Sequence, residues 1–567
     1  MSKQSAKWQC YRINPNRLIK LLCAVGLLGC ILLTVWKSHE IRQSATIPYQ
    51  TQASTGRGHS VDVKSLIGAF VEEDEPTEFQ HIPLETLIQQ YPPDTNYFLY
   101  NWLSFLGFNN VRYMIEHAYY YGNLINRTVV LPHRVHCRSC IHEGYCHIIG
   151  YPVDDSEIMD SPDGVDGKYR WSVPIEEFID MNHLTRNSGA RLIRMQDFLR
   201  LQLYYQDLAS KGSANKSNLI RQWDAVDPIA YLRDHRGISF EDGSADNFKV
   251  AFPEQSYAAT SEIGDVCGKE NSVDDLTPIL ERAEKLRQNG QTKIELYKYP
   301  NEPNYSVREF QTHTVDLDAV PELVGFAQEF STEKYPQRFL HFTARYIHFF
   351  PRRPFMFATE ANRETYDHFV LHLLRYPYRV RKAAEHLYRN LERKMVTKGI
   401  YPVSTSVPTT ENHQRAPLGQ FIGIHSRRGD FIRYNWVGET SNLNEWKHSM
   451  VQLVDHLKSQ QQLDLFYLAT DETSPDAFGE LYSQGMVRLY DLIDQEFASQ
   501  YSHLATFGDW LALLDQEILS RSKYFVPVYM SSVSGGVLNK RKAMGLPDAP
   551  ETREWMSRLL EDINLQM

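Results

Sequence analysis

Two adjacent arginines, Arg427 and Arg428, directly follow a strand-like segment, and their types and place suit them to binding an anion. The segment contains the uncharged apolar run 421–424, which is typical of a buried parallel strand. Ligands of open α/β folds bind outside the carboxyl ends of such strands. Because the guanidinium fork matches phosphate oxygens, the pair predicts a diphosphate site. The alternatives are an ordinary surface loop and an adhesion-like Arg428-Gly-Asp430 motif, which its place at a strand end disfavours.

Two further strand ends are expected beside the first. Residues 465–469 predict a strand followed by Asp471, whose carboxylate could accept from a ribose or base, or could cap a helix. Residues 524–528 predict a strand followed by small residues, 531–536, at a helix start, where free N–H groups and the helix dipole favour an anion. Asp515, on the helix before that strand, could bind a sugar or base if it faces inward, although exposed helix carboxylates are commoner.

The elements that carry these residues alternate regularly. They are expected as strand 421–425, helix 444–458, strand 465–469, helix 475–484, strand 487–491, helix 509–520, strand 524–528 and helices 539–544 and 551–563. This order predicts a doubly wound parallel sheet. A helix over 113–124 and a strand over 128–131 indicate an earlier α/β region. Residues 402–417, rich in Ser, Thr and Pro, look like a linker between domains.

The N-terminal segment predicts a membrane anchor. Five basic residues and no acidic one occupy positions 1–20, and residues 21–36 are uncharged. Sixteen helical residues span about 24 Å, and adding 18–20, with Lys20 snorkelling, approaches the bilayer core thickness. The basic flank predicts a cytoplasmic N-terminus. We therefore expect a single-pass type II protein of the Golgi or endoplasmic reticulum membrane, with a lumenal body; a cleaved signal peptide is the alternative.

Composition limits the remaining possibilities. The chain has 567 residues, enough for two or three domains, and its net charge of −10 gives no basic signature for nucleic acid. In an oxidising lumen, the four cysteines Cys137, Cys140, Cys146 and Cys267 predict two disulfides. The alternative is a zinc site formed by the first three cysteines with His136, His142 or His147. Asn215 and Asn304 begin plausible glycosylation sequons.

Several catalytic signatures are missing from the sequence. It contains no phosphate-binding Gly-rich loop ending in Gly-Lys-Ser/Thr, no His-Glu-x-x-His and no Gly-x-Ser-x-Gly. One Asp-x-Asp pair occurs, Asp316-Leu-Asp318, but polar residues precede it where metal-dependent glycosyltransferases have an apolar strand. We therefore expect no catalytic metal site at this pair.

In their order, the motifs resemble those of the GDP-fucose O-fucosyltransferase family. His425-Ser-Arg427-Arg428, the strand end at Asp471 and the serine turn at 531–534 follow one another as in that family. The block from Gly107 to Pro132 resembles the family's N-terminal signature. The resemblance covers about 97–135 and 420–545, and the middle of the chain shows no clear match.

The resemblance implies a GT-B architecture, in which two Rossmann-like domains face each other across a cleft. It implies metal-independent, inverting transfer of fucose from GDP-fucose to a hydroxyl of a protein or glycan, with no cofactor besides the donor. Arg427 is implied to contact the β-phosphate and assist the departure of GDP. The implied donor-binding residues are Gly107, Phe108, Asn109, Asn110, His425, Arg427, Arg428, Asp471, Asp515, Ser532 and Val533. The expected divisions are tail 1–17, anchor 18–36, stem 37–92, N-terminal domain 93–400 and C-terminal domain 401–567.

The chain departs from one family branch at the position of the general base. Fucosyltransferases acting on thrombospondin-type repeats have Glu where this chain has Leu106, which cannot accept a proton. Either another group or a water serves, or catalysis is impaired. Val533 replaces a more usual Phe. The alternatives are therefore a nucleotide-sugar or glycan-binding protein on the same fold, and a GT-B transferase using another sugar nucleotide.

Overall fold

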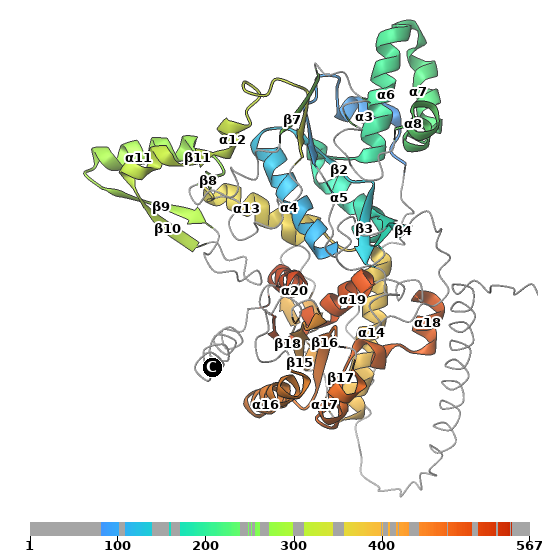
Figure 1. Cartoon of the computed structure of the whole chain (residues 1–567), viewed down its shortest axis with the longest axis vertical. Coiled ribbons are helices and arrows are strands. Elements are labelled where there is room, and N and C mark those ends of the chain that lie inside the picture. The colour runs from blue at the N-terminus through green and yellow to red at the C-terminus, as the bar shows by residue number, and fades with distance from the viewer. Residues whose placement is uncertain are drawn as a thin grey trace, which may run out of the picture. The chain divides into compact units, whose positions relative to one another are not determined.

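In the computed structural model the chain divides into two units, Met1–Gly68 and Ala69–Met567. Figure 1 labels the helices and strands of the second unit. The structure describes residues 81–100, 102, 108–138, 158–159, 170–238, 248, 251, 256–260, 272–298, 311–343, 356–398, 400, 406–408, 415–417, 419–429, 432, 442–472, 474–501, 508–528, 531–544 and 546. The expected anchor, Leu106, Gly107, three of the four cysteines and the expected helix 551–563 lie outside these residues. Within them, no helix has the length and apolar character needed to cross a membrane.

The first α/β region is built on a five-stranded parallel sheet with the strand order β6-β2-β1-β12-β7. Its strands are β1 (Tyr97–Tyr100), β2 (Thr128–Leu131), β6 (Leu192–Arg194), β7 (Tyr257–Thr260) and β12 (Phe339–Phe342). Helix α4 (Phe108–Leu124) contacts β1 and β2 and is buried along most of its length. The predicted strand 128–131 and helix 113–124 are confirmed, and the helix begins five residues earlier than expected.

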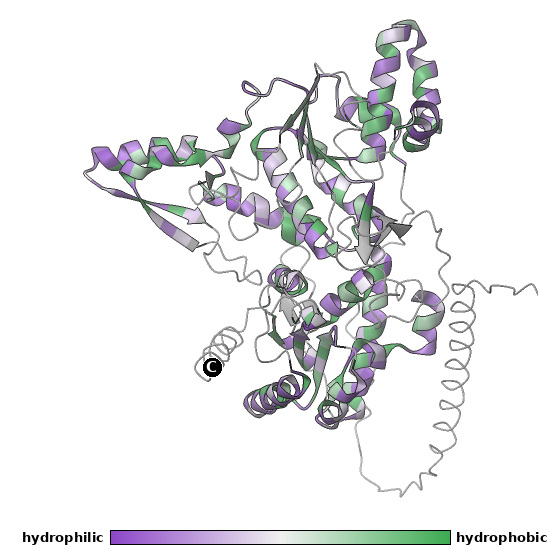
Figure 2. Cartoon of the chain, in the orientation of Figure 1, coloured by the Kyte–Doolittle hydropathy of each residue, from purple (hydrophilic) through white to green (hydrophobic). Residues whose placement is uncertain are grey.

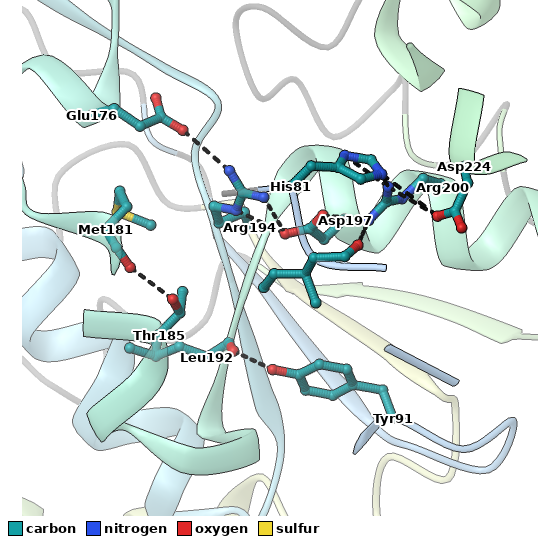
Figure 3. A network of polar contacts seen from close by, with 11 residues as sticks. His81, Tyr91, Glu176, Met181, Thr185, Leu192, Arg194, Asp197, Arg200 and Asp224 are labelled. Carbon is teal, nitrogen blue, oxygen red and sulfur yellow. Dashed lines mark hydrogen bonds and ion pairs between the residues drawn. The ribbon is translucent and has the colours of Figure 1, made fainter. Parts of the chain in front are cut away.

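A buried ion network lies at the carboxyl end of β6. Asp197 stands between Arg194 and Arg200 and binds both, at 2.6 and 2.9 Å (Figure 3). Nearby, the Asp224 carboxylate accepts from the backbone N–H of Leu84 at 2.8 Å. Asp224 also pairs with Arg200 at 3.4 Å, so these contacts join α3 (Leu84–Gln90), α6 (Met195–Lys211) and α7 (Lys216–Ala225). A fourth helix, α8 (Pro228–Arg236), packs against α6. Because the buried charges compensate one another, we read the network as structural.

The middle of the chain adds a small subdomain with its own core. It contains β8 (Ser272–Val273), α11 (Thr277–Gln288), the antiparallel pair β9 (Lys293–Lys298) and β10 (Gln311–Asp316), η7 (Leu317–Glu322) and β11 (Val324–Gly325). Its core includes Ile279, Ile294 and Val320. Asp316 ends β10 and Asp318 lies in η7, and both are exposed.

Buried Asp274 ties this subdomain to the rest of the unit. Its carboxylate accepts from the Tyr120 hydroxyl of α4 at 2.9 Å and from Asn362 Nδ2 at 2.6 Å. It also accepts from the backbone N–H groups of Asp275 and Ala358. Asn362 belongs to α13 (Glu360–His368). Asp274 therefore connects three segments that are distant in sequence.

The C-terminal sheet is also fully parallel, with the strand order β17-β16-β15-β18. Its strands are β15 (Gly419–Ser426), β16 (Phe466–Thr470), β17 (Met486–Val487) and β18 (Ser522–Val526). The helices between them are α16 (Leu443–Gln461), α17 (Gly479–Ser483), α18 (Gln495–Tyr501) and α19 (Gly508–Ser520), and α20 (Ser532–Ala543) follows β18. The predicted alternation of parallel strands and helices is confirmed.

Side chains alternate across this sheet and are buried on both faces. Ile422, Ile424 and Phe466 pack with Trp446 and other apolar residues of α16. Phe421, Tyr467 and Phe525 pack on the opposite face with residues of α19 and of α14 (Tyr378–Thr397). Figure 2 shows apolar residues, in green, along these strands. Fully burying one such side chain stabilises the fold by about 1.5–3 kcal/mol, which explains the unbroken apolar runs.

Four predicted segments differ from the structure. The expected strand 487–491 is only β17, followed by the 3-10 turn η12 (Leu489–Leu492), because the Asp491 carboxylate accepts from the backbone N–H of Arg488 and closes a turn. The expected helix 475–484 is η11 (Pro475–Ala477) followed by α17. The expected linker contains the strand pair β13 (Ser406–Pro408) and β14 (Arg415–Pro417). Finally, α20 starts seven residues before the expected helix 539–544.

Candidate active site

Three strand ends meet at one edge of the C-terminal sheet, as predicted. Strand β15 lies between β16 and β18, and all three run in the same direction. Their carboxyl ends therefore bring Arg427, Asp471 and the serine turn (residues 531–534) to the same edge. This is the edge at which open α/β folds bind ligands.

The loop that follows β15 is held by Asp471. Its Oδ1 atom accepts from the backbone N–H of Arg428 at 2.6 Å, and its Oδ2 atom accepts from that of Gly429 at 3.1 Å. A Cβ atom added to Gly429 would lie 2.7 Å from Oδ2, so this close approach requires glycine. The Asp471 carboxylate, for which a ribose or base contact or a helix cap was considered, thus positions the arginine loop, and its contact with the donor stays a prediction.

The two arginines differ in their surroundings. Arg428 is buried, its Nε donates to Glu472 Oε2 at 2.7 Å, and its guanidinium carbon lies 5.1 Å from the ring centre of Trp446. The Glu472 carboxylate also accepts from the backbone N–H of Ser474 at 2.8 Å. Arg427 is only partly buried. Arg428 therefore supports the loop, and of the two arginines Arg427 is the better candidate to bind phosphate.

His425 connects β15 to the serine turn. It is 8% exposed, and its Nδ1 atom lies 2.7 Å from the Ser534 hydroxyl, which also accepts from the backbone N–H of Val528 at 2.8 Å. Burial, reinforced by the positive charge of Arg427, lowers the pKa of His425 to about 3. The imidazole is therefore neutral at physiological pH and fixes the position of the turn without adding charge.

The serine turn begins a helix, as predicted. Ser531 is the N-cap of α20, so Ser532 and Val533 occupy its first turn. Backbone N–H groups in a first turn have no acceptor within the helix, and the helix dipole places partial positive charge there. The turn therefore suits an anion beside Arg427.

Asp515 faces the sheet. Its Oδ1 atom accepts a hydrogen bond from the Tyr467 hydroxyl of β16. Burial raises the pKa of Asp515 to about 7, although Tyr467 and the charge of Arg488 oppose the shift. Of the two orientations considered from the sequence, the structure has the inward one. The carboxyl can thus be protonated or charged near neutral pH.

The first turn of α4 contacts the C-terminal helices. The backbone N–H of Phe108 donates to Asp509 Oδ1 at 2.8 Å, and Asn109 Oδ1 accepts from Gln516 Nε2 at 2.9 Å. The Phe108 ring stacks on Phe178 with ring centres 4.2 Å apart. Asn110, also expected to bind the donor, lies in the same turn and is partly buried. Residues separated by some 400 positions in sequence therefore meet here.

Sequence reasoning missed four residues of this arrangement: Asp509, Gln516, Ser534 and Glu472. Asp509 and Gln516 are seven positions apart in α19, which places them on one helix face. Their polar types within an otherwise apolar helix were the available signal. Ser534 belongs to the serine turn but was given no role of its own, and Glu472 directly follows Asp471.

One group of possible metal ligands occurs in the described part of the chain, and it lies away from these strand ends in sequence. It consists of His386, Asp494 and Glu496. Asp494 already bonds His386 Nε2 at 2.9 Å and accepts from Asn390 Nδ2 at 2.9 Å and from the backbone N–H of Phe497 at 2.8 Å. These contacts give Asp494 a structural role.

Comparison with known families identifies the family to which the chain belongs. The family model described as GDP-fucose protein O-fucosyltransferase matches residues 152–544. The chain belongs to this family. It is accordingly a glycosyltransferase of the fucosyltransferase class. The match includes the middle of the chain, for which we found no resemblance, and begins after the 97–135 block on which we partly relied.

Solved structures of a family member show a distant likeness. The structure of POFUT1 in complex with GDP has 14% identity and a TM-score of 0.35, and the match covers 80% of this chain and 98% of that one. The structure of POFUT1 in complex with GDP-fucose has 13% identity and a TM-score of 0.34, covering 81% and 97%. At these TM-scores the superposition is loose, and the assignment rests on the family match. No curated protein matches the chain in sequence.

Proposed function

We propose that this fucosyltransferase moves fucose from GDP-fucose to a hydroxyl of a protein or glycan, with inversion at the anomeric carbon and without a metal ion. The observation that carries the proposal is the arrangement of Arg427, His425 and the serine turn at one sheet edge. A guanidinium and a helix N-terminus beside each other offer two sources of positive charge for a diphosphate.

The reaction makes use of that charge when GDP leaves. The acceptor oxygen attacks the anomeric carbon from the face opposite GDP, and the bond from that carbon to the β-phosphate oxygen breaks with its electron pair. Negative charge therefore grows on the β-phosphate. Arg427 and the N–H groups of Ser532 and Val533 would stabilise it, and such fixed donors are each worth roughly 10²–10³ in rate. These protein-borne charges support a reaction that needs no metal.

The proton of the acceptor hydroxyl must go to a base or to water. Leu106 cannot accept it, and this residue lies outside the described part of the structure. We propose that water or a group of the acceptor takes the proton, because the leucine side chain has no basic atom. General-base assistance contributes a further ~10²–10⁴-fold where it exists, so we expect slow turnover.

The proposed setting is the lumen of the Golgi or endoplasmic reticulum. Residues 18–36 would anchor the chain as a type II membrane protein, and residues 37–92 would hold the body off the membrane. The basic N-terminal flank and the uncharged stretch after it support this topology. We also propose that the two parallel sheets belong to the two domains of a GT-B architecture, with the domain boundary near residue 400.

The experiment that tests this function uses the full-length protein in detergent. GDP release from GDP-fucose is measured with and without EDTA, and GDP, UDP and CMP compete for binding in a thermal-shift assay. We expect EDTA-insensitive release and stabilisation by GDP alone. Because the donor is GDP-β-L-fucose, inversion should give the α-anomer of the fucosyl product, and nuclear magnetic resonance of the first-formed product should show it. Stabilisation by UDP and turnover of a uridine donor would instead indicate a different sugar nucleotide.

A further inference from the structure

One buried side chain, Gln516, bonds three distant segments. It is 0% exposed, and its Nε2 atom donates to Asn109 Oδ1 at 2.9 Å and to the carbonyl oxygen of Val533 at 3.1 Å. Its Oε1 atom accepts from the Tyr376 hydroxyl. Both N–H groups and the oxygen of the amide are thus engaged. Gln516 therefore links the first turn of α4, the first turn of α20 and the residue that precedes Pro377 and α14.

Gly536 in helix α20 leaves room for the side-chain amide of Gln516. A Cβ atom added to Gly536 would lie 2.5 Å from Gln516 Nε2 and 2.8 Å from its Cδ atom. Glycine lowers the stability of a helix interior by roughly 1 kcal/mol relative to alanine. The close approach of Gln516 explains why a glycine stands there.

Two other contacts hold the N-terminal part of α4 against α19 and the first turn of α20. Asp509, two turns before Gln516 in α19, accepts from the backbone N–H of Phe108 at 2.8 Å. Tyr113, one turn beyond Asn109 in α4, donates to the carbonyl oxygen of Ser532 at 3.4 Å. The first turns of α4 and α20 therefore lie together, and Gln516 is the residue that bonds directly to both.

We propose that Gln516 is a positioning residue for the donor, one that fixes the distance between Asn109 and the serine turn. The inference rests on the proposed function, in which the serine turn contacts GDP-fucose, and on the donor contact that the family resemblance implies for Asn109. Asn109 and Val533 are 424 positions apart, so only tertiary contacts hold them in register. Preorganised groups bind a ligand more tightly because less freedom is lost on binding.

Three variants separate positioning from simple stability. Gln516→Met keeps the size of the side chain but removes both donated bonds. Gly536→Ala leaves Gln516 chemically intact and pushes its amide away, and it favours the helix otherwise. Tyr376→Phe is the matched control, because it removes the hydroxyl that bonds Oε1 but leaves both donated bonds of Gln516 in place. For each full-length variant, the thermal midpoint, the dissociation constant of GDP by calorimetry, and kcat and KM for GDP-fucose are measured.

We expect Gln516→Met and Gly536→Ala to raise the dissociation constant of GDP and the donor KM roughly 10-fold, because a net hydrogen bond is worth a factor of about 2–13. Tyr376→Phe should change both by less than about 2-fold, even at an equal loss of thermal midpoint. If Gln516→Met fails to fold, Gly536→Ala decides. Wild-type GDP affinity and KM in a folded Gly536→Ala protein, or equal losses in Tyr376→Phe, would overturn the inference. Failure of the proposed function looks different, because the wild-type protein itself would then neither bind GDP nor consume GDP-fucose.

Discussion

The Nδ1 atom of His425 lies 2.7 Å from the hydroxyl oxygen of Ser534, so the end of β15 is bonded to the first turn of α20. The same hydroxyl accepts from the backbone N–H of Val528, just after β18. One serine therefore joins the residues on which the proposed phosphate site depends. Its loss should loosen the turn without removing any charge from the site.

We expect Ser534→Ala to lower the free energy of unfolding by about 1–2 kcal/mol, because two buried hydrogen bonds lose a partner. GDP affinity should fall roughly 10-fold. Denaturant unfolding and calorimetry measure the two quantities. Ser483→Ala is the control, since Ser483 is an exposed helical serine that bonds only its own turn. Equal behaviour of the two variants would show that Ser534 does not organise the turn.

Asp471 should act through the arginine loop. Asp471→Ala removes the acceptor of the backbone N–H groups of Arg428 and Gly429. We expect a loss of kcat of about 10-fold or more, because misplacing a charged donor weakens the stabilisation of the leaving group. Steady-state kinetics test this against Asp476→Ala, an exposed carboxylate in the following turn. Unchanged kcat in both variants would remove Asp471 from the account.

Asp515 should make folding stability depend on pH. Its folded-state pKa of about 7 lies above the ordinary value of 3.8. Between those values the folded protein keeps a proton that the unfolded chain releases, so stability falls as pH rises through this window. The thermal midpoint of Asp515→Asn should therefore decrease less between pH 5 and pH 8 than that of the wild type. Asp274, whose pKa burial raises to about 6, contributes equally to both proteins and cancels. Parallel pH profiles would contradict the assignment.

Asp274 should be the attachment point of the middle subdomain. Asp274→Ala leaves the Tyr120 hydroxyl, the Asn362 amide and two backbone N–H groups without their acceptor. We expect a loss of stability of about 2–4 kcal/mol, together with faster proteolysis of residues 272–325. Asp318→Ala, an exposed carboxylate of the same subdomain, is the control. Equal proteolysis rates would place the attachment elsewhere.

Local apolar patterns in the sequence were sufficient to predict the buried strands of the C-terminal sheet. The apolar runs that became β15, β16 and β18 were identified from sequence because strands buried on both faces exclude polar residues. A helix start was expected at residues 531–536, but the helix itself only over 539–544, and the glycine at position 536 is explained only by the approach of Gln516 from α19. Likewise, the different environments of Arg427 and Arg428 depend on Glu472 and Trp446, which are distant in sequence.

The most direct test of the central claim is kcat for GDP-fucose turnover in Arg427→Ala and Arg427→Lys. The control is Arg233→Ala, an exposed arginine on α8. If Arg427 stabilises departing GDP, kcat should fall by at least ~10² in the alanine variant. The lysine variant should recover only part of this loss, because an ammonium lacks the bidentate fork. A wild-type kcat in a folded Arg427→Ala protein would contradict the account.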